Sequence, residues 1–175
     1  MIDNNPKNLF IETGTYLGGG IDQALDLGFT TVVSIELSTR YYQLTSDKYR
    51  FHPNVKIIHG DSYKVLSEVL KYVNISATFW LDAHYSGGDT AIGDYNSPLM
   101  QELDVIAQHH IKTHTILIDD MRRWYKVNGE FEKTDERSNK FDFYDIAHKL
   151  KEINKQYKFK YLDAEYENDI LVAYL

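Results

Sequence analysis

The sequence contains no cysteine, only three prolines and no long hydrophobic run among its 175 residues. Without cysteine, the chain cannot form disulfides, thiolate metal sites or a cysteine nucleophile. No apolar stretch approaches the roughly 18 residues that a membrane span requires, and residues 1–10 lack the pattern of a secretory leader. We therefore expect a soluble, cytoplasmic protein that has no membrane partner.

Basic residues are scarce relative to acidic ones, with 19 Lys and Arg against 26 Asp and Glu and a net charge of −7. This balance opposes general binding to a phosphate backbone, so nucleic acid is not an expected partner. Hydrophobic residues make up 43% of the chain. That content suits one domain with a single core, spanning residues 1–175.

Short apolar runs alternate with segments of helical periodicity, which is typical of α/β proteins. The expected strands cover residues 8–11, 31–35, 55–58, 77–81, 115–118, 157–162 and 169–174. A short acidic turn separates the last two strands, and such a turn can join only antiparallel strands. The sequence therefore predicts a Rossmann-like, doubly wound α/β fold. Its seven-stranded sheet should be mainly parallel, with a C-terminal antiparallel hairpin.

Two long polar segments interrupt this pattern, at residues 86–96 and 121–140. Between them, Ser97 and Pro98 have the form of an N-cap followed by proline at the first helical position. The second segment has mixed charge and too few apolar residues to pack as a regular element. Both segments, including Trp124, could cover a polyhydroxylated ligand, and solvated loops are the alternative.

An acidic residue follows each of the five expected parallel strands. These residues are Glu12, Glu36, Asp61, Asp82 (two positions before His84), and the pair Asp119 and Asp120. In open parallel sheets, ligands bind beside the carboxyl ends of the strands. Any one of these acids could merely cap the next helix. Acids at all five strand ends together favour a ligand site.

A glycine-rich turn follows the first strand, with the pattern Glu-x-Gly-x-x-x-Gly from Glu12 to Gly18. Gly14 and Gly18 allow the backbone to pass close to a ligand, while the Glu12 carboxylate would repel phosphate and attract an ammonium group. The pattern differs from the Gly-x-Gly-x-x-Gly of dinucleotide-binding proteins. A tight turn without a ligand is the alternative. Glu36, at the end of the second strand, is placed to accept hydrogen bonds from both hydroxyls of a ribose, or else to cap the next helix.

These features together resemble the class I S-adenosylmethionine-dependent methyltransferases. The resemblance covers the whole chain in element order and implies the strand order 3-2-1-4-5-7-6. It also implies that S-adenosylmethionine is the cofactor and S-adenosylhomocysteine the product. The residues that it places around the methionine, ribose and adenine parts of the cofactor are Glu12, Gly14, Thr15, Tyr16, Gly18, Glu36, Leu37, Asp61, Ser62 and Asp82.

After the fourth strand the chain reads Asp82-Ala83-His84-Tyr85, without the prolines common in enzymes of this class that methylate amino groups. It resembles instead the metal-dependent O-methyltransferases, including those that act on catechols and macrocin-type sugars. That resemblance implies a Mg²⁺ or similar divalent ion held by Asp82, Asp119 and Asp120. Carboxylates so close together must bind protons or recruit a cation. The alternative is that Asp119 or Asp120 caps a turn or pairs with a nearby arginine.

His84 is our first candidate for the general base, because an imidazole ordinarily titrates near neutrality, and Asp82 is the second. A histidine that only forms hydrogen bonds is the alternative. The catechol enzymes place a lysine near the fourth strand, where this chain has Tyr85. Residues 162–166 nearly repeat residues 81–85, in a turn that we expect to be inert.

We expect methyl transfer to a hydroxyl of a small molecule or glycan. A metal-independent methyltransferase that uses His84 and Asp82, or a non-catalytic cofactor-binding module, are the alternatives. Many relatives carry helices before the first strand that cover the active site, whereas here that strand begins within ten residues. The cover must come from the two polar segments, from a partner subunit of a homo-oligomer, or from a longer polypeptide of which this chain is a part.

Overall fold

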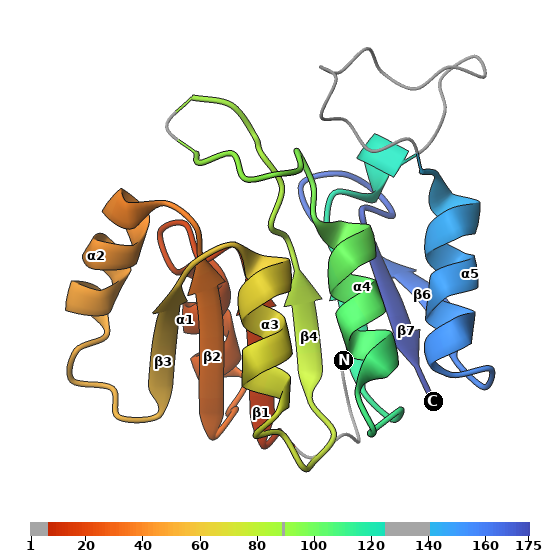
Figure 1. Cartoon of the computed structure of the whole chain (residues 1–175), viewed down its shortest axis with the longest axis horizontal. Helices are drawn as coiled ribbons and strands as arrows, with labels where there is room; N and C mark the ends of the chain where they lie inside the picture. Colours follow the sequence, from red (N-terminus) through yellow and green to blue (C-terminus); the bar gives the residue numbers. More distant parts are fainter. Residues whose placement is uncertain (1–6, 89, 125–140) are drawn as a thin grey trace.

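The computed structural model describes residues 7–88, 90–124 and 141–175. Seven strands form one sheet in the order β3-β2-β1-β4-β5-β7-β6 (Figure 1). The strands are β1 Leu9–Thr13, β2 Thr31–Glu36, β3 Val55–His59, β4 Thr78–Leu81, β5 Thr115–Ile118, β6 Lys158–Leu162 and β7 Ile170–Tyr174. All neighbours are parallel except β7, which runs antiparallel to both β5 and β6. The predicted fold and strand order are confirmed.

Helices cover both faces of the sheet. In Figure 1, α3 Ser62–Leu70, α4 Leu99–Gln108 and α5 Phe143–Ile153 lie in front of it, and α1 Gly19–Asp26 lies behind. The helix α2 Thr39–Lys48 lies beside the edge strand β3. None of the described helices combines the length and apolar character needed to cross a bilayer.

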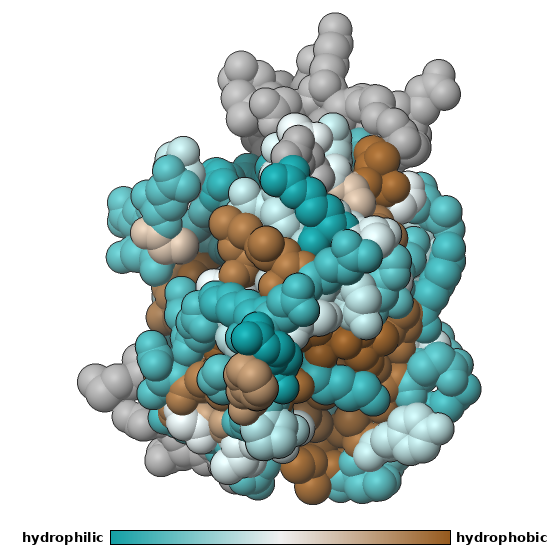
Figure 2. Space-filling model, turned by 90° about the vertical axis from the view of Figure 1, so that its left-hand side faces the viewer, coloured by the Kyte–Doolittle hydropathy of each residue, from teal (hydrophilic) through white to brown (hydrophobic). Residues whose placement is uncertain are grey.

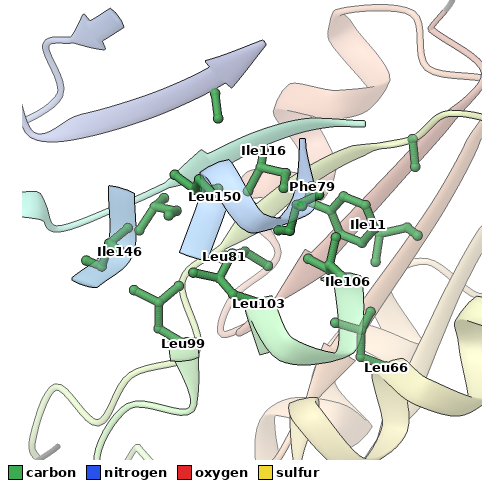
Figure 3. Close-up of a cluster of buried hydrophobic side chains, with 14 of the residues drawn as sticks. Ile11, Leu66, Phe79, Leu81, Leu99, Leu103, Ile106, Ile116, Ile146 and Leu150 are labelled. Carbon is green, nitrogen blue, oxygen red and sulfur yellow. The ribbon is translucent and has the colours of Figure 1, made fainter. Parts of the chain in front are cut away.

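The main hydrophobic core lies between the sheet and the helices α3, α4 and α5. Figure 3 shows side chains of β1 and β4, such as Ile11 and Phe79, meeting Leu103 and Ile106 of α4. A smaller cluster on the opposite face joins Phe10, Val32 and residues of α1. Hydrophilic side chains predominate on the face at the α2 end, with smaller hydrophobic patches between them (Figure 2). Packing on both faces fixes the strands whose carboxyl ends carry the predicted site.

The start of α4 differs from the prediction by one residue. Pro98 is the N-cap and the helix begins at Leu99, whereas the sequence pattern placed the N-cap at Ser97. The Ser97 hydroxyl still accepts a hydrogen bond from the Leu99 N–H, over 3.4 Å. The serine therefore holds the entry to the helix without being its cap.

The segment at residues 121–140 is not irregular throughout, which corrects the prediction. Met121–Trp124 form a short 3₁₀ helix (η1), and Met121 is completely buried. Trp124 packs against the core and stacks on Phe141, with 4.4 Å between ring centroids. Trp124 is therefore partly buried against the core, and it also borders a small pocket beside Asp82 and Asp119. The remainder of the segment, residues 125–140, lies outside the described residues.

Candidate functional site

A cleft of about 660 Å³ lies at the carboxyl ends of the parallel strands. Residues that follow β1, β2, β3 and β4 contribute to its walls, and the segment after β4 closes one side. The cleft brings together most of the predicted site residues, namely Gly14, Tyr16, Glu36, Leu37, Asp61, Ser62, Asp82 and His84. The acids that follow β2, β3 and β4 therefore share one cavity, whereas Glu12 and the acids after β5 do not line it.

Five predicted site residues do not line this cleft, namely Glu12, Thr15, Gly18, Asp119 and Asp120. Glu12 is 2% exposed and accepts a hydrogen bond from the Ser34 hydroxyl, which lies 2.5 Å from the Thr15 hydroxyl. Burial raises the pKa of Glu12 to about 8, with the Ser34 hydrogen bond opposing the rise. Glu12 is therefore a neutral acid beneath the turn at neutral pH, not a carboxylate at its mouth that attracts an ammonium group.

We expect Glu12→Gln to be more stable than the wild type at pH 8, with the gain shrinking as the pH falls toward 5. Unfolded Glu12 ionises near its ordinary pKa of 4.5, whereas folded Glu12 keeps its proton to about pH 8, so rising pH favours the unfolded wild type. Gln keeps the shape and an oxygen acceptor for Ser34. Urea unfolding from pH 5 to 8 measures the difference, and a pH-independent difference would contradict the raised pKa.

The turn after β1, residues 14–20 and called the glycine turn below, is shaped by close backbone approaches. Gly14 has a φ of +86°, and a Cβ there would lie 2.6 Å from the carbonyl oxygen of Asp82. The Tyr16 N–H donates to Glu36 Oε2 over 2.8 Å. The Tyr16 ring packs on the Tyr41 ring, with 4.7 Å between the ring centroids. The turn therefore lies directly against the ends of β2 and β4.

Glu36 lines the cleft and holds two backbone segments. Besides the Tyr16 N–H, it accepts a hydrogen bond from the Ser38 N–H over 2.7 Å, through Oε1. A carboxylate offers about four lone-pair directions, so both oxygens keep acceptor capacity for a ligand in the cleft. This arrangement is compatible with the predicted contact to two ribose hydroxyls.

His84 lies between two carboxylates. Its Nδ1 is 3.1 Å from Asp82 Oδ1, and its Nε2 is 2.8 Å from Asp120 Oδ2. Burial lowers the pKa of His84, but the hydrogen bonds to Asp120 and Asp82 outweigh burial and raise it to about 9. The ring is therefore an imidazolium at neutral pH and cannot accept a proton. A proton held in this way favours Asp82, the second candidate, over His84 as the general base.

Asp120 is surrounded by cationic groups of the chain itself. Its carboxylate lies 2.6 Å from Arg122 and 3.0 Å from Arg123, in addition to His84. Burial alone would raise the pKa of Asp120. The opposing effect of His84 and the two arginines is larger and brings the pKa down to about 2. The arginine pairing that the sequence left open is thus present. From the sequence, repulsion among Asp82, Asp119 and Asp120 predicts a bound cation. The cationic side chains around Asp120 partly take the place of that cation.

Asp119 has a different environment from its neighbour. It accepts a hydrogen bond from the Asp120 N–H over 2.9 Å, and burial and the charge of Asp82 raise its pKa to about 6. The predicted metal trio is divided between two clusters that share Asp120. One contains Asp82 and His84 and the other Asp119 and Asp169, each with ligand atoms within 4.8 Å of one another.

The β6–β7 turn also reaches the neighbourhood of Asp120. Asp169, 2% exposed, is paired with Arg122, whose guanidinium lies 4.4 Å from the centroid of the Tyr166 ring. Arg122 in turn holds Asp120. Sequence reasoning missed this contact because 47 residues separate Arg122 from Asp169, and no local pattern links them.

Sequence reasoning also missed Glu102 of α4. This side chain is 1% exposed, and its Oε1 has no partner among the described residues. Burial raises its pKa to about 7, although Ser62 and Thr13 beside it oppose the rise. A signal was available, because Glu102 lies between Leu99 and Ile106 on the apolar face of α4. A glutamate at such a position indicates a buried acid.

Comparisons with known proteins show which solved structures resemble this fold. No protein-family model and no curated protein matches the sequence. Among solved structures, an rRNA methylase-like protein from Clostridium thermocellum matches with a TM-score of 0.59 and 15% identity, over 97% of this chain and 88% of that one. A caffeoyl-CoA O-methyltransferase-like protein from Staphylococcus aureus matches with a TM-score of 0.57 and 14% identity, over 95% of this chain and 75% of that one.

A third similar structure is an S-adenosylmethionine-dependent methyltransferase from Clostridium acetobutylicum. It matches with a TM-score of 0.52 and 12% identity, over 96% of this chain and 83% of that one. The three matches span nearly the whole chain. The chain has the fold of the class I S-adenosylmethionine-dependent methyltransferases.

Proposed function

We propose that this protein is an S-adenosylmethionine-dependent methyltransferase that methylates a hydroxyl oxygen, on a sugar or glycan. The observation that carries the proposal is the convergence of Gly14, Glu36, Asp61 and Asp82 on one cleft of this fold. The similar structures are named for different acceptors, rRNA among them. The choice of a hydroxyl therefore rests on this chain's own residues.

The proposed cofactor site uses each wall of the cleft differently. Gly14 leaves room for the methionine part beside β4, and Glu36 accepts the ribose hydroxyls. Asp61 and Ser62, at the start of α3, border the adenine. Asp82 offers negative charge near the positively charged sulfonium of the cofactor. The sulfonium loses its positive charge once the methyl group has moved.

Transfer of the methyl group requires a proton acceptor. The acceptor oxygen forms a bond to the methyl carbon as the carbon–sulfur bond breaks, and the hydroxyl proton must leave. Because His84 is already protonated, we assign the proton to the carboxylate of Asp82, whose side chain is 30% exposed at the cleft wall. His84 then acts by orienting Asp82 through the 3.1 Å contact to Oδ1.

A divalent metal at this site also belongs to the proposal. The donor types suit a hard cation, since Asp82 and Asp120 offer carboxylate oxygens in one cluster, with Asp119 beside them. His84 belongs to the same cluster and would have to release its proton to bind a metal. A bound metal would lower the pKa of a coordinated acceptor hydroxyl. The imidazolium and two arginines around Asp120 favour the second candidate, a metal-independent transfer that relies on Asp82 and His84.

Binding of S-adenosylhomocysteine provides the first test. We expect the nucleoside to raise the melting temperature, because a ligand that binds the folded state stabilises it. Absence of any shift, with and without Mg²⁺, would contradict the proposed cofactor. Labelled-methyl transfer to a panel of sugars and catechols, with and without a chelator, then separates the two catalytic candidates. Chelator-insensitive transfer would exclude the metal, and nucleoside binding without transfer would favour a non-catalytic module.

We expect Asp82→Asn to reduce methyl transfer at least 100-fold while leaving the affinity for S-adenosylhomocysteine within about threefold of the wild type. The amide keeps the shape of the side chain but cannot accept the hydroxyl proton, and general-base contributions reach about 10² to 10⁴. Asp26→Asn, at the exposed end of α1, is the matched control. Wild-type transfer rates in Asp82→Asn would refute the proposed base.

A further inference from the structure

The glycine turn is held on its outer side, away from the cleft, by the end of α2. Lys48 Nζ, in the last turn of α2, donates to the Leu17 carbonyl over 3.2 Å and to Asp22 Oδ2 over 2.7 Å. The hydroxyl of the next residue, Tyr49, lies 2.7 Å from both the Gly18 carbonyl oxygen and Asp22 Oδ1. Two consecutive carbonyls of the turn are thus held by two consecutive side chains.

Packing at Gly18 makes this contact specific. Gly18 has a φ of +84°, and a Cβ there would lie 2.5 Å from Tyr49 Oη and 2.8 Å from the ring. Tyr49 is 5% exposed and belongs to the cluster under α1. The glycine at this position therefore serves the tyrosine ring, not the cleft, which Gly18 does not line.

The opposite side of the turn is held by the start of the same helix. Glu36 accepts from the N–H groups of Tyr16 and Ser38, and the rings of Tyr16 and Tyr41 are in contact. The helix α2 therefore contacts the glycine turn at both of its ends. The contacts of Lys48 and Tyr49 hold the turn on its outer side, which a ligand in the cleft does not reach.

We propose that Tyr49, with Lys48 and Asp22, is a positioning residue that keeps the glycine turn in the conformation that receives the cofactor. It touches neither the cleft nor the reacting atoms and acts through Gly18 and Leu17. The inference rests on the proposed function, in that the ligand held by the turn is the cofactor of a methyltransferase.

Calorimetric titration with S-adenosylhomocysteine tests the proposal. We expect Tyr49→Phe, which keeps the ring and removes the hydroxyl, to bind the nucleoside about tenfold more weakly than the wild type. Lys48→Met, a milder change at a half-exposed side chain, should weaken binding about threefold. Tyr72→Phe, which removes a hydroxyl from a ring that is 84% exposed, is the matched control and should bind as the wild type does.

Amide hydrogen exchange gives a readout that does not need the cofactor. The Gly18 N–H donates to the Thr15 carbonyl over 2.8 Å within the turn, so Tyr49→Phe should accelerate its exchange at least fivefold while leaving the amides of β2 unchanged. Wild-type exchange at Gly18 and wild-type affinity in both variants would overturn the inference. A lowered melting temperature with unchanged affinity would also overturn it, as a purely structural role. If the wild-type protein fails to bind the nucleoside but the exchange prediction holds, the proposed function fails. The positioning of the glycine turn by Tyr49 is then still supported.

Discussion

Gly14→Ala is expected to abolish measurable binding of S-adenosylhomocysteine and to lower the free energy of unfolding by about 3 kcal/mol. An L-residue at a φ of +86° is strained, at a cost of about 1–2 kcal/mol. The added Cβ would also lie 2.6 Å from the Asp82 carbonyl oxygen and 3.2 Å from the Cα of Ala83. Because these are backbone atoms of the cleft wall, they cannot move aside without displacing Asp82. Urea unfolding and calorimetric titration measure the two effects.

Gly28 provides a matched control for the conformational part of this effect. It has the same φ of +86°, but a Cβ there would meet no atom within 4 Å. Gly28→Ala should therefore cost about 1 kcal/mol of stability and leave nucleoside binding unchanged. Equal losses of stability and affinity in the two variants would show that backbone strain alone matters and that the approach to Asp82 does not.

Acidification from pH 7 to pH 4 is expected to remove about 3 kcal/mol of stability from the wild type relative to His114→Asn. Burial and the neighbouring His109 lower the pKa of His114 from an ordinary 6.5 to about 4. Folded His114 therefore stays neutral where the unfolded chain binds a proton. Its stabilising contribution is complete above about pH 6.5 and is lost as the pH falls toward 4.

The hydrogen bonds around this histidine explain why it cannot be protonated in place. The Ala77 N–H donates to His114 Nδ1 over 3.1 Å, and His109 Nε2 lies 3.0 Å from the Val73 carbonyl, to which it must donate. The remaining 3.0 Å bond then runs from His114 Nε2–H to His109 Nδ1. A proton added to either ring would face an N–H donor instead of a lone pair.

Urea unfolding between pH 4 and pH 7 checks this prediction. Asn keeps an oxygen acceptor for the Ala77 N–H and has no titrating group, so the difference between the two proteins isolates His114. His148→Asn, on the exposed side of α5, is the control and should follow the wild type within about 0.5 kcal/mol. If the free energy of unfolding changed with pH in the same way for the wild type and His114→Asn, the lowered pKa of His114 would be contradicted.

The fold could be predicted because each element carries its own periodicity. The alternating pattern gave the strands and helices, and the short acidic turn required the antiparallel pair β6 and β7. Residues at the strand ends, such as Glu36 and Asp82, were also predictable, since parallel strands carry their carboxyl ends to one edge. These inferences needed no knowledge of long-range contacts.

Glu12 shows where such reasoning fails. The apolar run ends at Ile11, but β1 continues to Thr13 and pairs Glu12 with Ser34 of β2. Glu12 is therefore inside a strand, where side chains alternate between faces, and it points toward α1 with Phe10 instead of into the cleft. The hydrophobic pattern indicates an approximate strand end but does not fix the last paired residue.

The contact between Asp120 and His84 could not be predicted for a different reason. Its φ of +55° and its contact with His84 depend on how the chain leaves β5, and Asp169 reaches Arg122 only after β7 has entered the sheet. Local sequence patterns contain neither fact. The charges around a site therefore require the folded structure, even where the acids themselves are apparent.

The position of β7 bears on how the protein is made. Residues 170–174 occupy an interior place in the sheet, between β5 and β6, although they follow the other six strands of this sheet in the sequence. Until they emerge from the ribosome, β5 has no neighbour on that side and its apolar edge stays open to other nascent chains. Synthesis of β7 thus completes the sheet and the contact between Asp169 and Arg122 together, so the charges around Asp120 are assembled only after this region has been translated.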